Sequence, residues 1–311
     1  MNKVIDGALG SIVGDAMGVP IELVSRDICL HNPITKMEGY GVHNVCAGSW
    51  SDDTSMSLAT MDSYISLGKI DYDDIMDKWY EWINDNKYTP SNHCFGVGHT
   101  CLEAIYNHSR KHIEPLKCGL NNIRNNGNGS LMRMFPVVYY AYYKNLEGID
   151  LYNYVKNMSS LTHAHEISVL GCYIYVLYAL KLLNGYDKVK AYKTIQNEDY
   201  SYFSNESIDA YKRILKSDIR LLKMYDIKSS AYIVDTLEAS IWVLLKSKDY
   251  KEAIIGAINL GGDADTTGAV CGMLAGIIYK YESIPKEWLD KLIKKDYLIE
   301  LSNKYEKELQ K

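Results

Sequence analysis

The chain has 311 residues, of which 47% are hydrophobic and 23% are charged, so it can bury a large core as one big domain or two small ones. Its formal net charge of −5 and pI near 5.9 argue against a reader of the nucleic-acid backbone, which would carry basic stripes. The chain has seven cysteines, none in C-x-x-C spacing, and no secretory signal opens it. These features favour a reduced, cytoplasmic protein.

Apolar side chains recur at helical spacing along most of the chain, and no run of alternating polar and apolar residues predicts a strand. The six prolines gather in no Ser/Pro-rich linker. One all-α domain over residues 1–311 is therefore the simplest expectation. In chain order, the predicted helices are 3–17, 54–68 ending at Gly68, 71–85, 167–183, 209–226, 231–247 and the segment after Asp265.

The longest apolar run, residues 167–183, could suggest a membrane span. It contains Ser168, Gly171 and Lys181 and falls short of the roughly 20 apolar residues that cross a bilayer. A helix that is hydrophobic on all faces is typical of the centre of a helical core. We therefore expect no membrane span.

The helix after Asp265 has Gly268, Gly272 and Gly276 at every fourth position. Glycine lacks a Cβ atom, so this spacing predicts a helix whose backbone closely approaches a neighbour.

Two predicted helices begin with paired aspartates. Helix capping explains either pair taken alone, because Asp, Ser and Thr accept hydrogen bonds from the first N–H groups of a helix. Both helices look buried, however, and four carboxylates in one dry place would repel each other unless cations neutralised them. Oxygen ligands suit Mg²⁺, Mn²⁺ or Ca²⁺ rather than zinc. We therefore predict a dinuclear metal site formed by Ser51, Asp52, Asp53, Asp263, Asp265 and Thr266.

A glycine-rich loop, "NNGNGSLMR" (125–133), precedes another helical start. Backbone N–H groups of such loops can form a nest that holds phosphate. An ordinary Asn-Gly turn has the same sequence pattern. The residues alone leave both interpretations open.

Other polar residues favour ordinary structural roles when each is taken by itself. The spacing in "HCFGVGHTC" (93–101) matches no familiar zinc site. His163 and His165 precede the most hydrophobic helix, where core packing or capping is the commoner role unless a ligand pocket lies beside them. Glu22, after Pro20, would usually be a solvated surface residue.

Taken together and in order, these blocks resemble the ADP-ribosylglycohydrolases, the family that contains the dinitrogenase-reductase-activating glycohydrolase and the ADP-ribosylarginine and ADP-ribosylserine hydrolases. The resemblance spans about residues 5–280. It implies an all-α fold with a dinuclear Mg²⁺ or Mn²⁺ centre in a cleft. It also implies hydrolysis of the bond between ADP-ribose and an acceptor, either a protein side chain or a small conjugate. The matching blocks are "GALGSIVGDAMGVPIE", "WSDDTSMSLA", "GNGSLMRMFPV", "LTHAHEISVLGC" and "GGDADTTGAVCGMLAG".

The resemblance also implies roles for individual residues. Both aspartate clusters match metal-ligand triplets of the family, and Glu22 matches an acidic residue that relays protons near the metal. Gly96 departs from the pattern, since some bacterial arginine-directed members carry Asp in that block. The implied catalytic residues are Glu22, Asp52, Asp53 and Asp265, and the implied substrate contacts are Asn128, Gly129, Ser130, Leu131, Met132, Arg133 and His163.

Two rival functions stay open at this level. The chain could be an inactive member that binds ADP-ribose or serves a structural role, or a di-metal phosphoesterase that cleaves the pyrophosphate. In each case we expect a monomer that binds neither nucleic acid nor membranes.

Overall fold

The computed structural model describes residues 2–311, and over that range it contains helices and three isolated β-bridges but no sheet. The predicted all-α fold is therefore confirmed. The α-helices are α1 (Lys3–Gly18), α2 (Arg26–His31), α3 (Asp52–Leu67), α4 (Tyr72–Asp85), α5 (His99–Ser109), α6 (Phe135–Tyr143), α7 (Gly148–Ser160), α8 (Glu166–Leu183), α9 (Lys188–Ile195), α10 (Asn205–Ala210), α11 (Lys212–Lys216), α12 (Ile233–Lys246), α13 (Tyr250–Ile258), α14 (Ala264–Tyr279), α15 (Lys286–Leu289) and α16 (Lys295–Leu309). Short 3₁₀ turns, η1 (Val19–Ile21), η2 (Gly41–His43), η3 (Pro115–Lys117), η4 (Ile123–Asn125), η5 (Asn128–Ser130), η6 (Ile219–Leu221), η7 (Met224–Asp226) and η8 (Tyr281–Ser283), join them.

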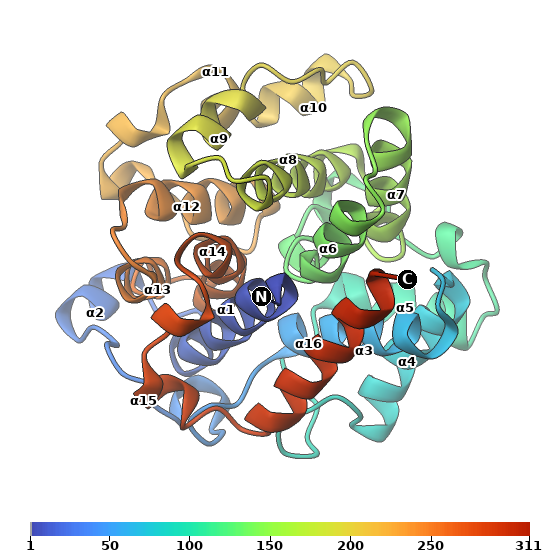
Figure 1. The fold of residues 1–311 in the computed structure, drawn as a ribbon, viewed down its shortest axis with the longest axis horizontal. Coiled ribbons are helices and arrows are strands. Elements are labelled where there is room, and N and C mark those ends of the chain that lie inside the picture. The colour runs from blue at the N-terminus through green and yellow to red at the C-terminus, as the bar shows by residue number, and fades with distance from the viewer. Residues whose placement is uncertain (1) are drawn as a thin grey trace.

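Helices α1 and α14 lie side by side at the centre of the molecule (Figure 1) and run antiparallel. A Cβ atom at Gly14 would lie 2.1 Å from the carbonyl oxygen of Gly268, and one at Gly10 would lie 2.4 Å from that of Gly272. The close approach predicted from the glycine spacing is confirmed. Because the two helices run in opposite directions, the carboxyl end of α1 meets the amino end of α14.

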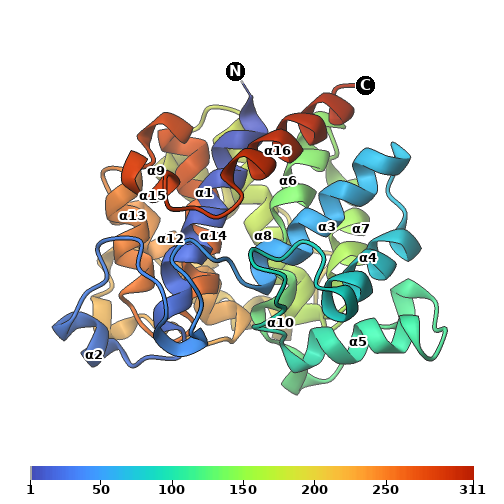
Figure 2. The same cartoon turned by 90° about the horizontal axis from the view of Figure 1, so that it is seen from below.

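The other helices form layers around this pair. Helices α8 and α12 separate it from the outer helices α9, α10 and α11, while α3, α4 and α16 lie on the other side (Figure 1). Both termini emerge at the same edge (Figure 2), where the amide of Asn2 donates to Asn303 over 2.6 Å. One continuous apolar core runs through the layers.

Five predicted helices correspond closely to α1, α3, α4, α8 and α12. The predicted end of α3 is also confirmed. Gly68 has φ of +68° there, and its N–H donates to the carbonyl oxygen of Tyr64 over 2.8 Å.

The predicted helix over 209–226 is wrong, because α10, α11, η6 and η7 divide this segment. A continuous helix would use the carbonyl oxygens of Ile214 and Ser217 for its own N–H groups. The hydroxyl of Tyr192 instead reaches both oxygens, at 2.9 and 2.8 Å. Asp218 then starts a new turn by accepting from the N–H of Arg220 over 3.1 Å. Tertiary hydrogen bonds thus outweigh the helical periodicity of this segment.

Two segments, Lys3–Ile21 and Glu166–Leu183, are long and apolar enough to cross a membrane by length and composition. In the fold, 89% and 83% of their most apolar windows are buried against other helices. Core helices of globular proteins show the same burial.

Candidate active site

The amino ends of α3 and α14 converge with the carboxyl end of α1 and with η5. A cleft of about 240 Å³ opens at this junction. Ten of the predicted catalytic, substrate-contact and metal-ligand residues line it: Glu22, Asp52, Asp53, Asn128, Gly129, Met132, His163, Asp263, Asp265 and Thr266.

Asp15 positions the amino end of α3 from a neighbouring helix. It is fully buried on α1, and its carboxylate accepts from the N–H of Ser51 over 3.0 Å and from the hydroxyl of Thr54 over 2.6 Å. Burial raises the pKa of Asp15 to about 6, although hydrogen bonds from Thr54 and Ser51 act in the opposite direction. The sequence analysis missed Asp15. The signal that could have found it is a carboxylate on a helix that is otherwise apolar.

Asp53 has a carboxylate oxygen that nothing in the described part of the chain satisfies. Its Oδ2 accepts from the hydroxyls of Ser51 over 3.2 Å and Thr266 over 3.3 Å. Its Oδ1 is buried, and no hydrogen-bond partner is found for it within residues 2–311. Thr266 thus joins the two acidic clusters, and the unpaired oxygen points to a missing ligand.

Asp263 stands at the capping position of α14, but its side chain accepts no hydrogen bond from the helix. Its Oδ2 accepts instead from the amide of Asn128 over 2.8 Å. Helix capping therefore does not account for Asp263. The contact ties the glycine-rich loop directly to the acidic cluster.

Glu22 lies among the aspartates. Its carboxylate and those of Asp263 and Asp265 each offer an oxygen, and the three oxygens lie within 4.8 Å of one another. The carboxylate of Glu22 also contacts Nε2 of His43, and the side chains of Glu22 and His43 are each about 20% exposed. His43 was also missed from the sequence, because it lies in a loop that carries no recognisable motif.

Mutual repulsion in the acidic cluster is substantial. Burial, followed by the charge of neighbouring carboxylates, raises the pKa values of Asp52, Asp53 and Asp265 well above the usual range. Such a group is neutralised either by protons or by cations. Buried oxygen ligands alone, with one buried oxygen unpaired, fit a hard divalent cation.

His163 faces the glycine-rich loop with its Nε2 atom. A Cβ atom at Gly129 would lie 2.8 Å from the His163 Cε1, so only glycine permits this contact. Burial, and then the charge of Arg133, lowers the pKa of His163 to about 3. The ring is therefore neutral at physiological pH.

A buried hydrogen-bond chain reaches the Nδ1 atom of that neutral ring. The guanidinium of Arg133 donates to Thr162 Oγ1 over 2.9 Å, and Thr162 Oγ1 lies 2.8 Å from Nδ1 of His163. Arginine only donates, so Oγ1 keeps one free lone pair and its own proton, and it can donate to Nδ1 or accept from an Nδ1–H. Donation to Nδ1 places the ring proton on Nε2, toward the cleft, and this is the tautomer that we predict.

Three residues of the predicted substrate loop lie beneath the cleft rather than on its wall. Leu131 is in the core, and the hydroxyl of Ser130 contacts the thiol of Cys172 at 3.3 Å. Arg133 is 1% exposed and stacks on Trp79, with 4.2 Å from its guanidinium carbon to the ring centre. These side chains support the loop from below. Ser51 likewise lies just behind the wall as the cap of α3.

Gly96 lies on the cleft wall with φ of +80°. A Cβ atom there would come within 2.6 Å of the Asp52 carboxylate. A side chain at this position would therefore reach the acidic cluster directly.

A family model described as ADP-ribosylglycohydrolase matches residues 1–311. The chain is 30% identical to the ADP-ribosylarginine hydrolase Tri1 of Serratia proteamaculans (strain 568) over 310 residues, which is 97% of this chain and 78% of that protein. It is 32% identical to the ADP-ribosyl-[dinitrogen reductase] glycohydrolase of Rhodospirillum rubrum, covering 94% of this chain and 90% of that protein. The ADP-ribosylhydrolase ARH3 of Mus musculus is 21% identical, covering 90% of this chain and 84% of that protein.

Among solved structures, an ADP-ribosylglycohydrolase-related protein complex superposes with a TM-score of 0.82 at 25% sequence identity. The match covers 100% of this chain and 98% of that one.

Proposed function

This chain belongs to the ADP-ribosylglycohydrolase family and is a glycohydrolase that removes ADP-ribose from acceptors; from that premise we propose that it is metal-dependent and acts on ADP-ribosylated arginine. The observation that carries the metal dependence is the convergence of Glu22, Asp263 and Asp265 beside the unpaired oxygen of Asp53. So dense a set of carboxylates needs compensating charge at neutral pH.

Two divalent cations would be held by Ser51, Asp52, Asp53, Asp263, Asp265 and Thr266. When bound, such cations supply Lewis acidity and neutralise the carboxylates. Mg²⁺ and Mn²⁺ are the candidates, since every ligand atom is an oxygen.

Glu22 would move the proton in the reaction. Cleavage joins a water oxygen to the anomeric carbon of the distal ribose and breaks the bond from that carbon to the acceptor, through an oxocarbenium-like state. One carboxylate oxygen of Glu22 is engaged by His43, which leaves the other to take the proton that water releases. The acceptor leaves with the electron pair of the broken bond, and Glu22 then passes that proton to it and becomes a carboxylate again.

The glycine-rich loop and His163 would position the substrate. With its ring proton on Nε2, His163 would be a donor suited to a phosphate or ribose oxygen. Asn128 couples the loop to Asp263, so binding energy from the pyrophosphate can orient the sugar over the acidic cluster.

The proposed acceptor is the guanidinium of arginine. The cleft is lined by five carboxylates and, among the described lining residues, by no lysine or arginine. Two divalent cations would neutralise four of these five carboxylates. The remaining negative charge would attract a positively charged acceptor. The Serratia relative, at 30% identity, is named for the arginine linkage.

The test is release of ADP-ribose, in Mg²⁺ buffer, from matched peptides carrying ADP-ribosyl-arginine or ADP-ribosyl-serine. We expect the arginine peptide to be processed faster by tenfold or more. Faster processing of the serine peptide would overturn the proposal that arginine is the acceptor. AMP and a phosphoribosylated peptide as products would instead indicate pyrophosphate cleavage.

We also propose that the protein works in the cytoplasm. All seven cysteines are free thiols, as expected in a reducing compartment. Immunolocalisation in the source cells tests this, and a secreted pool with oxidised thiols would contradict it.

A further inference from the structure

A second cavity, larger than the active-site cleft, lies away from it and shares no lining residue with it. It measures about 670 Å³ and opens between the α6–α7 connection, the carboxyl half of α8 and the segment after α9. Ligand pockets commonly have volumes of about 300–1,000 Å³. Size therefore permits a small organic molecule.

Leucine and tyrosine side chains form part of the wall of this distal cavity. Leu151 and Leu177 are 2% and 7% exposed, and both line it. Tyrosine rings face it as well: Tyr202 stacks on Tyr152 with 4.8 Å between ring centres, and Tyr173 packs edge-on against the same ring. Such walls accommodate an apolar body and the face of a cation.

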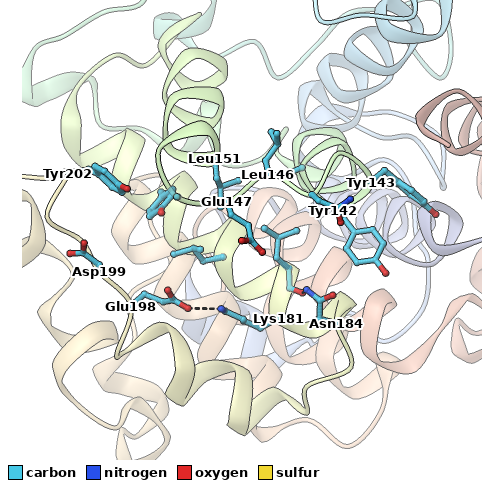
Figure 3. A pocket seen from close by; sticks show the side chains of 16 residues that line it. Tyr142, Tyr143, Leu146, Glu147, Leu151, Lys181, Asn184, Glu198, Asp199 and Tyr202 are labelled. Atoms are coloured by element: carbon cyan, nitrogen blue, oxygen red, sulfur yellow. Dashed lines mark hydrogen bonds and ion pairs between the residues drawn. The ribbon is translucent and has the colours of Figure 1, made fainter. Parts of the chain in front are cut away.

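The rim of the distal cavity is negatively charged. Three carboxylates line it, those of Glu147, Glu198 and Asp199, against the single ammonium of Lys181. Lys181 is already paired with Glu198 over 2.6 Å, and Figure 3 shows this pair below Glu147, which reaches in from the start of α7. No ion pair is formed by Glu147 within the described chain. The rim thus carries a net negative charge.

Tyr173 presents its hydroxyl to the distal cavity. Its side chain is 4% exposed and lines the cavity, and within residues 2–311 its hydroxyl takes part in no hydrogen bond. Burial, followed by the nearby Tyr202, Glu198 and Asp199, raises the pKa of Tyr173 to about 12. Because those neighbours also line the distal cavity, the hydroxyl is available to a ligand there.

We propose that the distal cavity binds a small organic cation with an apolar body, such as an alkylguanidinium. The cation would lie against Glu147 and the tyrosine rings, the alkyl group would cover Leu151 and Leu177, and the hydroxyl of Tyr173 would gain a partner. This binding is independent of the proposed reaction.

Calorimetric titration with butylguanidinium, compared with butylurea, tests the charge requirement. The two probes have nearly the same shape, and only the first is charged. Saturating Mg²⁺ and ADP-ribose keep the acidic cleft occupied, so that the cation cannot bind there. We expect saturable binding of butylguanidinium and affinity for butylurea at least roughly tenfold weaker, since hydrogen bonds to charged groups are the stronger ones. Equal affinities, or no saturable binding at millimolar concentrations, would overturn the proposal.

Two variants locate the site. Tyr173→Phe removes only the unpartnered hydroxyl and should weaken butylguanidinium roughly three- to tenfold, the usual effect of one hydrogen bond. Glu147→Gln, on the exposed rim, should weaken it by a similar factor and reduce its salt dependence. Tyr186→Phe and Glu206→Gln, matched changes outside the distal cavity, should bind like the parent. Unchanged affinity in both cavity variants would place the cation elsewhere.

Discussion

Thr162 presents its hydroxyl oxygen 2.8 Å from Nδ1 of His163, and the same oxygen accepts from Arg133 over 2.9 Å. A buried arginine thus holds in place the hydroxyl that contacts a cleft histidine. This arrangement accounts for Arg133, which is 1% exposed and has one guanidinium nitrogen without a partner in the described chain. Its role is to position a donor rather than to touch substrate.

The first prediction concerns the tautomer of His163. NMR of the ¹⁵N-histidine-labelled protein should find His163 neutral and protonated at Nε2. Thr162→Val removes the hydroxyl, so both tautomers should be populated and kcat/KM should fall roughly three- to thirtyfold through a weakened substrate contact. Thr162→Ser keeps the hydroxyl and serves as the control. Protonation at Nδ1 in the parent protein would contradict the predicted tautomer and would mean that Thr162 accepts from the ring.

The second prediction is a pH dependence of stability due to His163. Its pKa falls from 6.5 to about 3 on folding, chiefly through burial. The unfolded chain therefore binds more protons, and the contribution of His163 is fully present above pH 6.5 and is lost as the pH falls toward 3. Between pH 6.5 and 5 the free energy of unfolding of the parent protein should fall by about 1–2 kcal/mol more than that of His163→Gln. Urea unfolding of both proteins at each pH measures the difference. Parallel pH profiles would mean that the histidine is not held neutral.

The third prediction is strict dependence on a divalent cation. Chelation should abolish turnover, Mg²⁺ or Mn²⁺ should restore it, and metal should raise the melting temperature because it binds the folded state. Full activity after exhaustive chelation would reject the metal site.

Single-ligand variants sharpen that test. Asp53→Asn and Asp263→Asn keep the side-chain shape but remove one ligand charge, so metal affinity and rate should fall together. Asp235→Asn, an aspartate on α12 outside the cleft, is the control. If a variant binds metal with the same affinity as the parent protein, the substituted aspartate has a purely structural role.

The fourth prediction concerns the central helix pair. Gly14→Ala places a methyl group 2.1 Å from the carbonyl oxygen of Gly268, so the helices must separate. We expect a loss of roughly 1–3 kcal/mol or more, as in overpacked cores, together with weaker metal binding, because this pair aligns Glu22 with Asp263. Gly98→Ala, where a Cβ atom meets nothing within 4 Å, should leave the free energy of unfolding nearly unchanged.

The sequence predicted the parts of this molecule that depend on local pattern. Glycines at every fourth position predicted the α1–α14 contact, and paired aspartates at two buried helix starts predicted an acidic cluster. It did not predict His43 or Asp15, whose roles arise only when segments distant in the chain meet. The same reason explains the broken helix at 209–226, where the Tyr192 hydroxyl takes two carbonyl oxygens. Long-range hydrogen bonds leave no periodic trace in a sequence.

The fifth prediction separates chemistry from binding at Glu22. Its carboxylate lies with those of Asp263 and Asp265, whereas the glycine-rich loop and His163 supply other residues of the cleft wall. Glu22→Gln keeps the volume and one carbonyl oxygen toward His43, but it cannot accept a proton at neutral pH. General acid–base groups contribute about 10²–10⁴-fold, so single-turnover rates at saturating Mg²⁺ should fall within that range. The affinity for ADP-ribose should change less than about tenfold, because binding energy from the pyrophosphate is supplied elsewhere in the cleft.

His43→Gln is the matched control. Glu22 keeps its carboxylate in that variant, so the rate should fall far less than in Glu22→Gln. If Glu22→Gln turns over at a near-normal rate, another group must carry the proton, and the His43–Glu22 contact then serves only to hold η1 against η2.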